Sequence, residues 1–333
     1  MNQNVKVVVL GGGTGSFMLL EELKNHTKEL SAIVNMADDG GSTGVLRDEL
    51  GALPPGDIRQ CLVALSRSDK MRDLFNYRFE EGTFGGHSFG NMLITALEKT
   101  TGSFSEAVHV ASEILNIEGT VIPATLDNVR LRMDWQDEGV ILDGEHVIDD
   151  GMFSHDPRTA TLSLVPNASI NPEARHAIEE ADLIVLAPGD LYSSLGPLLA
   201  VDGMGDALAS SKATKMYVCN LTTKHGQTDN FTVSEHADEI ERLAGTRFLD
   251  AVVYSDHVPE KRLLKKYEAE QSFLVPVDGS LLEAATYAAL GGNLLDPLSR
   301  PGVKDALGVP RSFIRHDSSA VTKLLFDFYN ERG

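Results

Sequence analysis

The 333-residue chain is poor in cysteine, lacks any long apolar run and begins without a leader-like segment. Its two cysteines, Cys61 and Cys219, lie inside apolar runs, which indicates buried thiols in a reducing compartment rather than a disulfide framework or a metal cluster. No apolar run reaches the roughly 18 residues that a membrane span needs. Because neither a basic segment nor a cleavage site precedes the first strand-like run, we expect no secretory signal and a cytoplasmic protein.

Basic residues are also scarce, since 29 Lys and Arg stand against 49 Asp and Glu, for a net charge of −20. A surface of this charge repels polyanions, which argues against nucleic acid or an anionic membrane as a partner. A small anionic ligand is still compatible, because backbone amides and a few arginines can hold it locally. Apolar residues make up 42% of the chain, close to the globular average, so wholesale disorder is excluded.

The order of the apolar runs predicts an α/β fold. Val5–Leu10 and Leu30–Met36 are strand-like and flank a helix that reaches about His26, and such a βαβ unit implies a parallel sheet. Further strands are expected at 182–187, 215–220 and 251–254, and helices at 58–65, after 87, and at 171–180, 280–290 and 321–329. We therefore predict a Rossmann-like, doubly wound, mostly parallel sheet in one domain that spans residues 1–333.

Two kinds of segment interrupt this pattern. Residues 118–165 alternate between apolar and polar side chains and contain the turn signals Asp143-Gly144 and Asp150-Gly151, so we predict an antiparallel β excursion within the same domain. Residues 38–44 and 51–57 are rich in glycine and polar side chains and are expected to be loops.

A glycine cluster lies between the first strand and the first helix and consists of Gly11, Gly12, Gly13, Thr14 and Gly15. Glycine lets the backbone approach a phosphate, and a helix N-terminus supplies free N–H groups with a partial positive charge. The cluster is neither G-x-G-x-x-G nor a Walker loop, and a tight turn without a ligand is the alternative. Its place between a strand and a helix favours an anion site.

The pair Asp38 and Asp39 follows the second strand. Ligands of open α/β sheets bind at the carboxyl ends of strands. The pair could therefore bind ribose hydroxyls, hold a divalent cation such as Mg²⁺ or accept a proton. A capping pair in a solvated loop is the alternative. Because Gly12 and Pro188-Gly189 are expected at the same end of the sheet, we favour a functional role.

Three further positions are candidates, each with a structural alternative. Arg59 lies in the first turn of a helix that Asp57 caps, where a cation is unfavourable unless an anion lies nearby; an exposed side chain or a pair with Asp57 explains it equally well. Ser88 and Asn91 could bond a phosphate or a sugar, and Ser88 is also a good helix cap.

Two later strands end in polar loops. Gly189, Asp190, Tyr192 and Ser193 follow the strand at 182–187, and Asn220 and Thr222 follow the strand at 215–220. Glycine with hydroxyl and amide side chains is typical of a phosphate-binding nest. The chain has no G-x-S-x-G, H-E-x-x-H or C-x-x-C pattern, which argues against a serine hydrolase or a zinc enzyme, and we assign no metal ligands.

Taken in order, these motifs resemble the YvcK branch of the CofD-like superfamily, the gluconeogenesis factors. The likeness rests on the glycine cluster, the Asp38 loop, Pro54-Pro-Gly-Asp-Ile-Arg59, Gly86-His-Ser-Phe-Gly-Asn91, Pro188-Gly-Asp-Leu-Tyr-Ser and Cys219-Asn-Leu-Thr-Thr. It spans about residues 5–267 and resumes at 314–317. The sibling branch is 2-phospho-L-lactate transferase, which moves a phospholactyl group from a nucleotide-linked donor onto a deazaflavin alcohol to build coenzyme F420.

The resemblance implies a UDP-sugar ligand, such as UDP-N-acetylglucosamine, and a regulator of cell shape and wall synthesis during growth on gluconeogenic carbon sources. It implies Tyr267 and Arg315 as determinants of UDP-sugar binding and places Ser318 where relatives carry a phosphorylated threonine. Asp190 departs from the expected serine, and residues 280–309 resemble a helical insertion. We also expect a homo-oligomer, a dimer.

Two other functions are compatible with the motifs. A phosphoryl-linked group transferase of the 2-phospho-L-lactate transferase kind would use Asp38 or Asp39 to hold Mg²⁺ or to activate an alcohol. A nicotinamide-dependent oxidoreductase is suggested by the fold alone and is least favoured, because G-x-G-x-x-G is missing.

Overall fold

The computed structural model describes residues 4–269, 271–296 and 314–332. Its centre is a seven-stranded sheet in the order β10-β9-β8-β7-β1-β2-β3, and every neighbouring pair in it is parallel. The strands are β1 (Val7–Gly11), β2 (Leu30–Val34), β3 (Thr120–Pro123), β7 (Leu183–Leu186), β8 (Thr214–Val218), β9 (Ala251–Ser255) and β10 (Ala288–Gly292). The predicted α/β class and mostly parallel sheet are confirmed.

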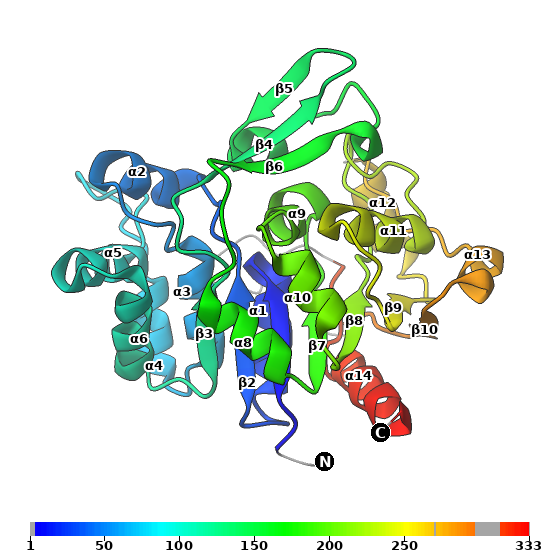
Figure 1. Ribbon diagram of the computed structural model, residues 1–333, viewed down its shortest axis with the longest axis horizontal. Helices are drawn as coiled ribbons and strands as arrows, with labels where there is room; N and C mark the ends of the chain where they lie inside the picture. Colours follow the sequence, from blue (N-terminus) through cyan, green and yellow to red (C-terminus); the bar gives the residue numbers. More distant parts are fainter. Residues whose placement is uncertain (1–3, 270, 297–313, 333) are drawn as a thin grey trace.

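Both faces of this sheet are buried, which explains why its strands are almost continuously apolar. Alternate residues of β1 enter different cores: Val7 and Val9 belong to one, and Val8 and Leu10 to the other. Helices cover both faces, so the sheet is doubly wound (Figure 1).

The first core is completed by α1 (Gly13–Leu23), α3 (Gly56–Leu65), α4 (Asp69–Asn76), α5 (Phe89–Thr101), α6 (Phe104–Leu115) and α14 (Ser318–Arg332). The second core is completed by α8 (Pro172–Glu180), α9 (Gly196–Leu199), α10 (Met204–Ser210), α11 (Val233–Ala244) and α13 (Gly279–Ala284). Two short helical elements, α7 (Glu145–Asp149) and the π-helical turn η2 (Leu191–Leu195), also contribute buried residues to the second core. The remaining helices are α2 (Gly41–Leu50), α12 (Lys261–Ala269) and the 3-10 turn η1 (Pro157–Thr159).

A small antiparallel sheet lies beyond the carboxyl ends of the parallel strands (Figure 1). It has the order β5-β4-β6 and consists of β4 (Arg130–Trp135), β5 (Val140–Asp143) and β6 (Thr161–Val165). Leu131, Met133 and Trp135 alternate along β4 and are buried in the second core. This is the predicted β excursion with one correction at its start: 120–123 form β3 at the edge of the parallel sheet, so the antiparallel part begins at Arg130.

The structure differs from the predicted elements in two further places. The helix expected over 280–290 ends at Ala284, and β10 follows, pairing with β9. Alanine and leucine favour a helix locally, whereas the open edge of β9 offers backbone partners that only a strand can use. The rest of the predicted insertion, 297–309, lies outside the described residues. Within the expected loop at 38–44, α2 already begins at Gly41.

None of the helices built from the described residues is long and apolar enough to cross a membrane.

Candidate functional site

A cavity of about 710 Å³ opens where the strand order reverses between β1 and β7. From β1 the chain proceeds to β2 and β3 on one side, and later from β7 to β8 and β9 on the other. The carboxyl edge at this switch point is where ligands bind in open α/β sheets, and the volume is typical of small-molecule sites, which span roughly 300–1,000 Å³. The described lining includes these predicted site residues: Gly12, Gly13, Thr14, Gly15, Asp38, Gly189, Asp190, Ser193, Asn220, Thr222, Tyr267 and Arg315.

Two glycines of the loop at the start of α1 are packed too tightly for side chains. A Cβ on Gly12 would overlap the Asp57 carboxylate, and a Cβ on Gly15 would overlap the Pro188 carbonyl oxygen. The Gly13 N–H donates to Asp57 Oδ1 at 3.0 Å. The N-terminus of α1 therefore already has an anionic partner from within the chain, at the place where an external anion was expected.

Three carboxyl groups on this part of the wall influence one another. Burial, followed by the Asp38 charge, raises the pKa of Asp57 to about 7. Burial and the same charge raise the pKa of Glu145 to about 9. Burial also raises the pKa of Asp38. The wall thus favours a bound proton or a cation near neutral pH, although no three His, Cys, Asp or Glu side chains of the described residues are placed to hold a metal by themselves.

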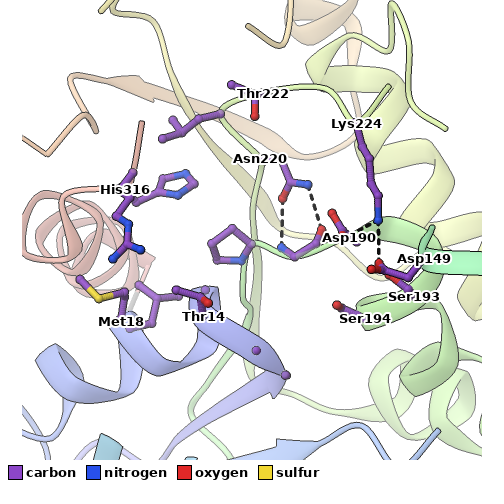
Figure 2. Close-up of a pocket in the computed structure, with 18 of the residues that line it drawn as sticks. Thr14, Met18, Asp149, Asp190, Ser193, Ser194, Asn220, Thr222, Lys224 and His316 are labelled. Atoms are coloured by element: carbon purple, nitrogen blue, oxygen red, sulfur yellow. Dashed lines mark hydrogen bonds and ion pairs between the residues drawn. The ribbon is translucent and has the colours of Figure 1, made fainter. Parts of the chain in front are cut away.

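An ion cluster closes another side of the cavity (Figure 2). Lys224 Nζ lies 2.6 Å from Asp149 Oδ1 and 2.9 Å from Asp190 Oδ2. The Ser193 hydroxyl donates to the same Asp149 oxygen at 2.6 Å. Asp149 belongs to α7, whereas the other three residues follow β7 and β8, so the cluster ties the antiparallel excursion to the edge of the parallel sheet.

Gln227 strengthens the same connection through the backbone. Its side-chain amide donates to the carbonyl oxygens of Ile148, Asp149 and Gly151 at 2.7–3.1 Å. These carbonyls lie at the end of α7, where a helix leaves its last carbonyl groups without intrahelical partners. Gln227 therefore fixes the position of α7 and with it the two acids that α7 contributes to the cavity.

Asn220 organises the loop after β7. Its side-chain oxygen accepts from the Gly189 N–H at 3.0 Å, and its NH₂ group donates to the Gly189 carbonyl at 2.9 Å (Figure 2). Both ends of the amide thus bind the backbone of one residue, Gly189. Asn220 lines the cavity chiefly as a support for the Pro188–Asp190 loop.

The C-terminal wall comes from α12 and from the segment before α14. The Tyr267 hydroxyl accepts from the Ile314 N–H at 3.0 Å, so Tyr267 lies beside Arg315 although the two are far apart in the sequence. Next along the wall, His316 Nε2 lies 3.1 Å from the Cys219 carbonyl oxygen. Ser318, at the start of α14, also lines the cavity.

Three of the predicted residues lie outside this cavity because they hold other parts of the fold together. Arg59 is buried and donates to the side-chain oxygens of Asn91 and Asn76, so it connects α3 with α5 and with the end of α4. Ser88 caps α5 by accepting from the Asn91 N–H at 3.2 Å. Ser88 therefore fits its structural alternative of helix capping. Arg59 differs from both of its alternatives, because it is buried rather than exposed and its side-chain hydrogen bonds go to Asn91 and Asn76 rather than to Asp57.

The other three predicted residues outside the cavity are Gly11, Asp39 and Tyr192. Gly11 ends β1 within the core. Asp39 accepts from the His146 N–H at 2.8 Å and so caps α7, which corrects the expectation that both members of the acid pair face one pocket. Tyr192 is completely buried and packs against Phe153 with their ring centroids 5.5 Å apart.

Several lining residues were not predicted as site residues: Asp57, Glu145, Asp149, Lys224 and His316. Asp57, Lys224 and His316 lie inside motifs that the sequence already singles out, so their position next to predicted residues was the available signal. Glu145 and Asp149 carry no such signal, because only the path of the antiparallel excursion brings α7 to the cavity.

Strand order and cavity together define the class of protein: a Rossmann-like α/β protein with a polar, small-molecule-sized cavity at its topological switch point. Residues 7–295 match the family described as 2-phospho-L-lactate transferase CofD, and the chain belongs to that family.

Relatives within the family are gluconeogenesis factors. The gluconeogenesis factor of Bacillus subtilis is 36% identical and aligns over 99% of this chain and 100% of its own length. A Clostridium acetobutylicum protein that carries the same name provisionally is 39% identical over 97% of this chain and 69% of its own. A crystal structure of a UPF0052 family member from Bacillus halodurans superposes with a TM-score of 0.87 at 33% identity, covering 97% of this chain and 99% of that one.

Proposed function

We propose that the cavity binds a UDP-sugar, such as UDP-N-acetylglucosamine, and that the protein regulates cell shape and wall synthesis during growth on gluconeogenic carbon sources. The observation that carries the proposal is the position of Tyr267 beside the segment of Arg315, on the wall of the same cavity as the glycine loop. A tyrosine ring is suited to stacking on a base, and the planar guanidinium of arginine is suited to a diphosphate.

The charges around the cavity suggest that such a ligand enters with a divalent cation. The described lining carries five carboxyl groups, Asp38, Asp57, Glu145, Asp149 and Asp190, against two basic side chains, Lys224 and Arg315. Lys224 is already paired with two of the acids. Mg²⁺ is commonly held by one or two carboxylates together with substrate phosphates. Asp38 and Asp57 fit this role, and a bound Mg²⁺ would offset the repulsion between the diphosphate and the acids.

Calorimetric titration with UDP-N-acetylglucosamine, with and without MgCl₂, tests the proposal, and GDP and NAD serve as comparison ligands. We expect the UDP-sugar to bind most tightly and to need Mg²⁺. Tyr267→Ala and Arg315→Ala should each weaken binding by roughly 1–3 kcal/mol, whereas Tyr267→Phe, which keeps the ring, should retain most of the affinity. Failure of the wild-type protein to bind the UDP-sugar in the presence of Mg²⁺ would refute the proposal.

The regulatory role calls for a test in cells. We expect the chain to restore normal shape and growth on a gluconeogenic carbon source to a Bacillus subtilis strain that lacks its own gluconeogenesis factor. The Arg315→Ala variant, produced at the same level, should fail to do so. If the wild type and Arg315→Ala rescued the strain equally well, the cellular role would not depend on ligand binding in the cavity.

A transferase is the second candidate, favoured by the family match and by the carboxyl groups near the glycine loop. In that reaction an alcohol oxygen would attack the donor phosphorus, the alcohol proton would pass to Asp38, and the nucleotide would leave. Asp38→Asn should then abolish turnover while it changes donor affinity by less than about tenfold, or roughly 1.4 kcal/mol. Formation of a phospholactyl-deazaflavin by the wild-type protein would favour the transferase over a pure binding role.

A further inference from the structure

We propose that His316 recognises the ligand as a neutral hydrogen-bond acceptor: its proton is fixed on Nε2, and its Nδ1 accepts from an N–H of the ligand, which we assign as the imide N–H of a uracil base. The inference rests on the proposed function, because it names the group by which the cavity would read a uridine nucleotide.

The first step is the position of the proton. His316 Nε2 lies 3.1 Å from the Cys219 carbonyl oxygen. A carbonyl oxygen can only accept, so Nε2 must carry the hydrogen. In a neutral imidazole with its hydrogen on Nε2, the other nitrogen, Nδ1, presents a lone pair.

The second step is the rigidity of the segment. The Asp317 N–H donates to the Leu294 carbonyl at 2.8 Å, and the Asp296 N–H donates to the Arg315 carbonyl at 2.9 Å, so His316 forms a bridge with Leu295 between these two bonds. The backbone is thus held on both sides of the ring, and the ring is held by Cys219. An acceptor fixed in this way selects among ligands by geometry as well as by chemistry.

The third step is the charge. Burial lowers the pKa of His316 to about 4, against the opposing effect of the hydrogen bond to Cys219. The ring is therefore neutral at pH 7 and adds no positive charge for a phosphate. Its lone pair would repel a phosphate oxygen, so the matching group on a ligand is a hydrogen-bond donor.

The fourth step is the direction in which the ring points. His316 lines the cavity, and Figure 2 shows its imidazole projecting inward. Among the described residues, none is hydrogen-bonded to Nδ1. The neighbouring Asn220 amide is held by Gly189 through both its oxygen and its NH₂ group, so its orientation is set by the Pro188–Asp190 loop. Because Tyr267 bonds the backbone two residues before His316, a base stacked on Tyr267 would bring its edge toward His316.

Two substitutions separate the roles of the two nitrogens. In His316→Asn the side-chain oxygen can replace Nδ1 as an acceptor, whereas in His316→Gln the amide NH₂ can replace Nε2 and keep the bond to Cys219. We expect the Asn variant to bind UDP-N-acetylglucosamine within about threefold of the wild type and the Gln variant to bind about tenfold more weakly. The reverse order would show that only the structural bond to Cys219 matters and would overturn the proposal.

A ligand carrying a methyl group on the imide nitrogen provides the matched chemical change. The N3-methylated UDP-sugar should bind the wild type about tenfold more weakly than the parent, and it should show little further loss in His316→Gln. An equal methyl penalty in both proteins would mean that Nδ1 does not contact this N–H, while the binding of the parent UDP-sugar, and with it the proposed function, would stand.

A measurement on the free protein tests the proton position without any ligand. Nitrogen-15 NMR of the imidazole groups, with the His316 signal assigned by its loss in His316→Gln, should show a neutral ring with its hydrogen on Nε2 at pH 7. A charged ring or a hydrogen on Nδ1 would refute the proposal whatever ligand binds. If the wild type binds no UDP-sugar, the proposed function fails and the assignment to uracil fails with it.

Discussion

Asp57 lies against the N-terminus of α1, where its carboxylate accepts the Gly13 N–H. An external phosphate would compete for the same amide, which is the usual anion partner at a helix N-terminus. A phosphate can therefore approach this loop when Asp57 is protonated, displaced or bridged by a cation. The raised pKa of Asp57 makes the first of these changes easier than it would be for an ordinary carboxylate, because Asp57 takes up a proton near neutral pH.

The raised pKa of Asp57 has a measurable effect on stability. A carboxyl group whose pKa is higher in the folded state stabilises the fold below its unfolded pKa, about 4, and this contribution is lost as the pH rises from there to the folded value, here about 7. We expect the free energy of unfolding to fall between about pH 4.5 and pH 7, and to fall less steeply in Asp57→Asn. The pKa of Glu145 is raised to about 9, so Glu145 also makes the free energy of unfolding fall as the pH rises. For this reason the Asp57→Asn variant should keep part of the pH dependence.

Urea unfolding at both pH values measures this difference. The control is Asp73→Asn, which removes an exposed carboxyl group on α4. The interpretation would be contradicted if Asp57→Asn and the control had the same slope as the wild type.

Gly12 allows a second prediction for a single residue. Gly12 lines the cavity and a Cβ there has no room beside the Asp57 carboxylate, so Gly12→Ala would put a methyl group where a phosphate must approach the loop backbone. We expect this variant to weaken nucleotide binding by at least about tenfold while the circular dichroism spectrum stays nearly unchanged. Gly279→Ala, where a Cβ meets nothing within 4 Å, is the matched control. Wild-type affinity in Gly12→Ala would show that the ligand does not depend on this loop.

Among the elements, α7 depends most on contacts from elsewhere in the chain. It has five residues, and it is held by the Asp39 cap, the Gln227 amide and the ion pair to Lys224. A helix this short has little stability of its own. Its place in the cavity wall therefore reflects tertiary contacts rather than its own sequence.

Lys224→Met should reduce the free energy of unfolding, because Asp149 and Asp190 would then face each other without a cation. The expected loss is about 1–3 kcal/mol, toward the lower end because the two carboxyl side chains are 37% and 39% exposed. The triple variant Asp149→Asn, Lys224→Met, Asp190→Asn should recover part of this loss, since it leaves no unpaired charge. Equal stability of the single variant and the wild type in urea unfolding would contradict this account.

The elements also show how far the sequence could predict the site. The strands were predictable from their apolar runs. Because the sheet was predicted to be parallel, it followed that Gly12, Asp38, Gly189 and Asn220 would lie at the same edge of it. The contribution of α7 was not predictable, because it depends on how the antiparallel excursion folds back. The same reason applies to Asp39, whose partner His146 lies on α7, within that excursion.

In the molecule as a whole, the charge of the surface and that of the cavity have the same sign. The net charge of −20 is matched by a cavity in which carboxyl groups outnumber basic side chains. Long-range attraction thus works against an anionic ligand, and specific contacts with a bridging cation must supply the affinity. The predicted homodimer is a separate property of the molecule, and analytical ultracentrifugation of the full chain would test it.

The cavity is lined by residues from both the first and the last parts of the described chain. Gly12–Gly15 come from the first βα unit, whereas Arg315 and His316 precede the last helix, α14, which packs against α1. Contacts between such distant segments form late in folding, because the chain between them must be ordered first. During refolding from urea, far-UV circular dichroism should recover before the ability to bind a nucleotide does.

Simultaneous recovery of both signals would mean that the ends meet early. If the lag is observed, a ligand of this cavity would distinguish finished molecules from those still folding, and a chain in synthesis would stay unable to bind until Arg315, His316 and α14 had left the ribosome.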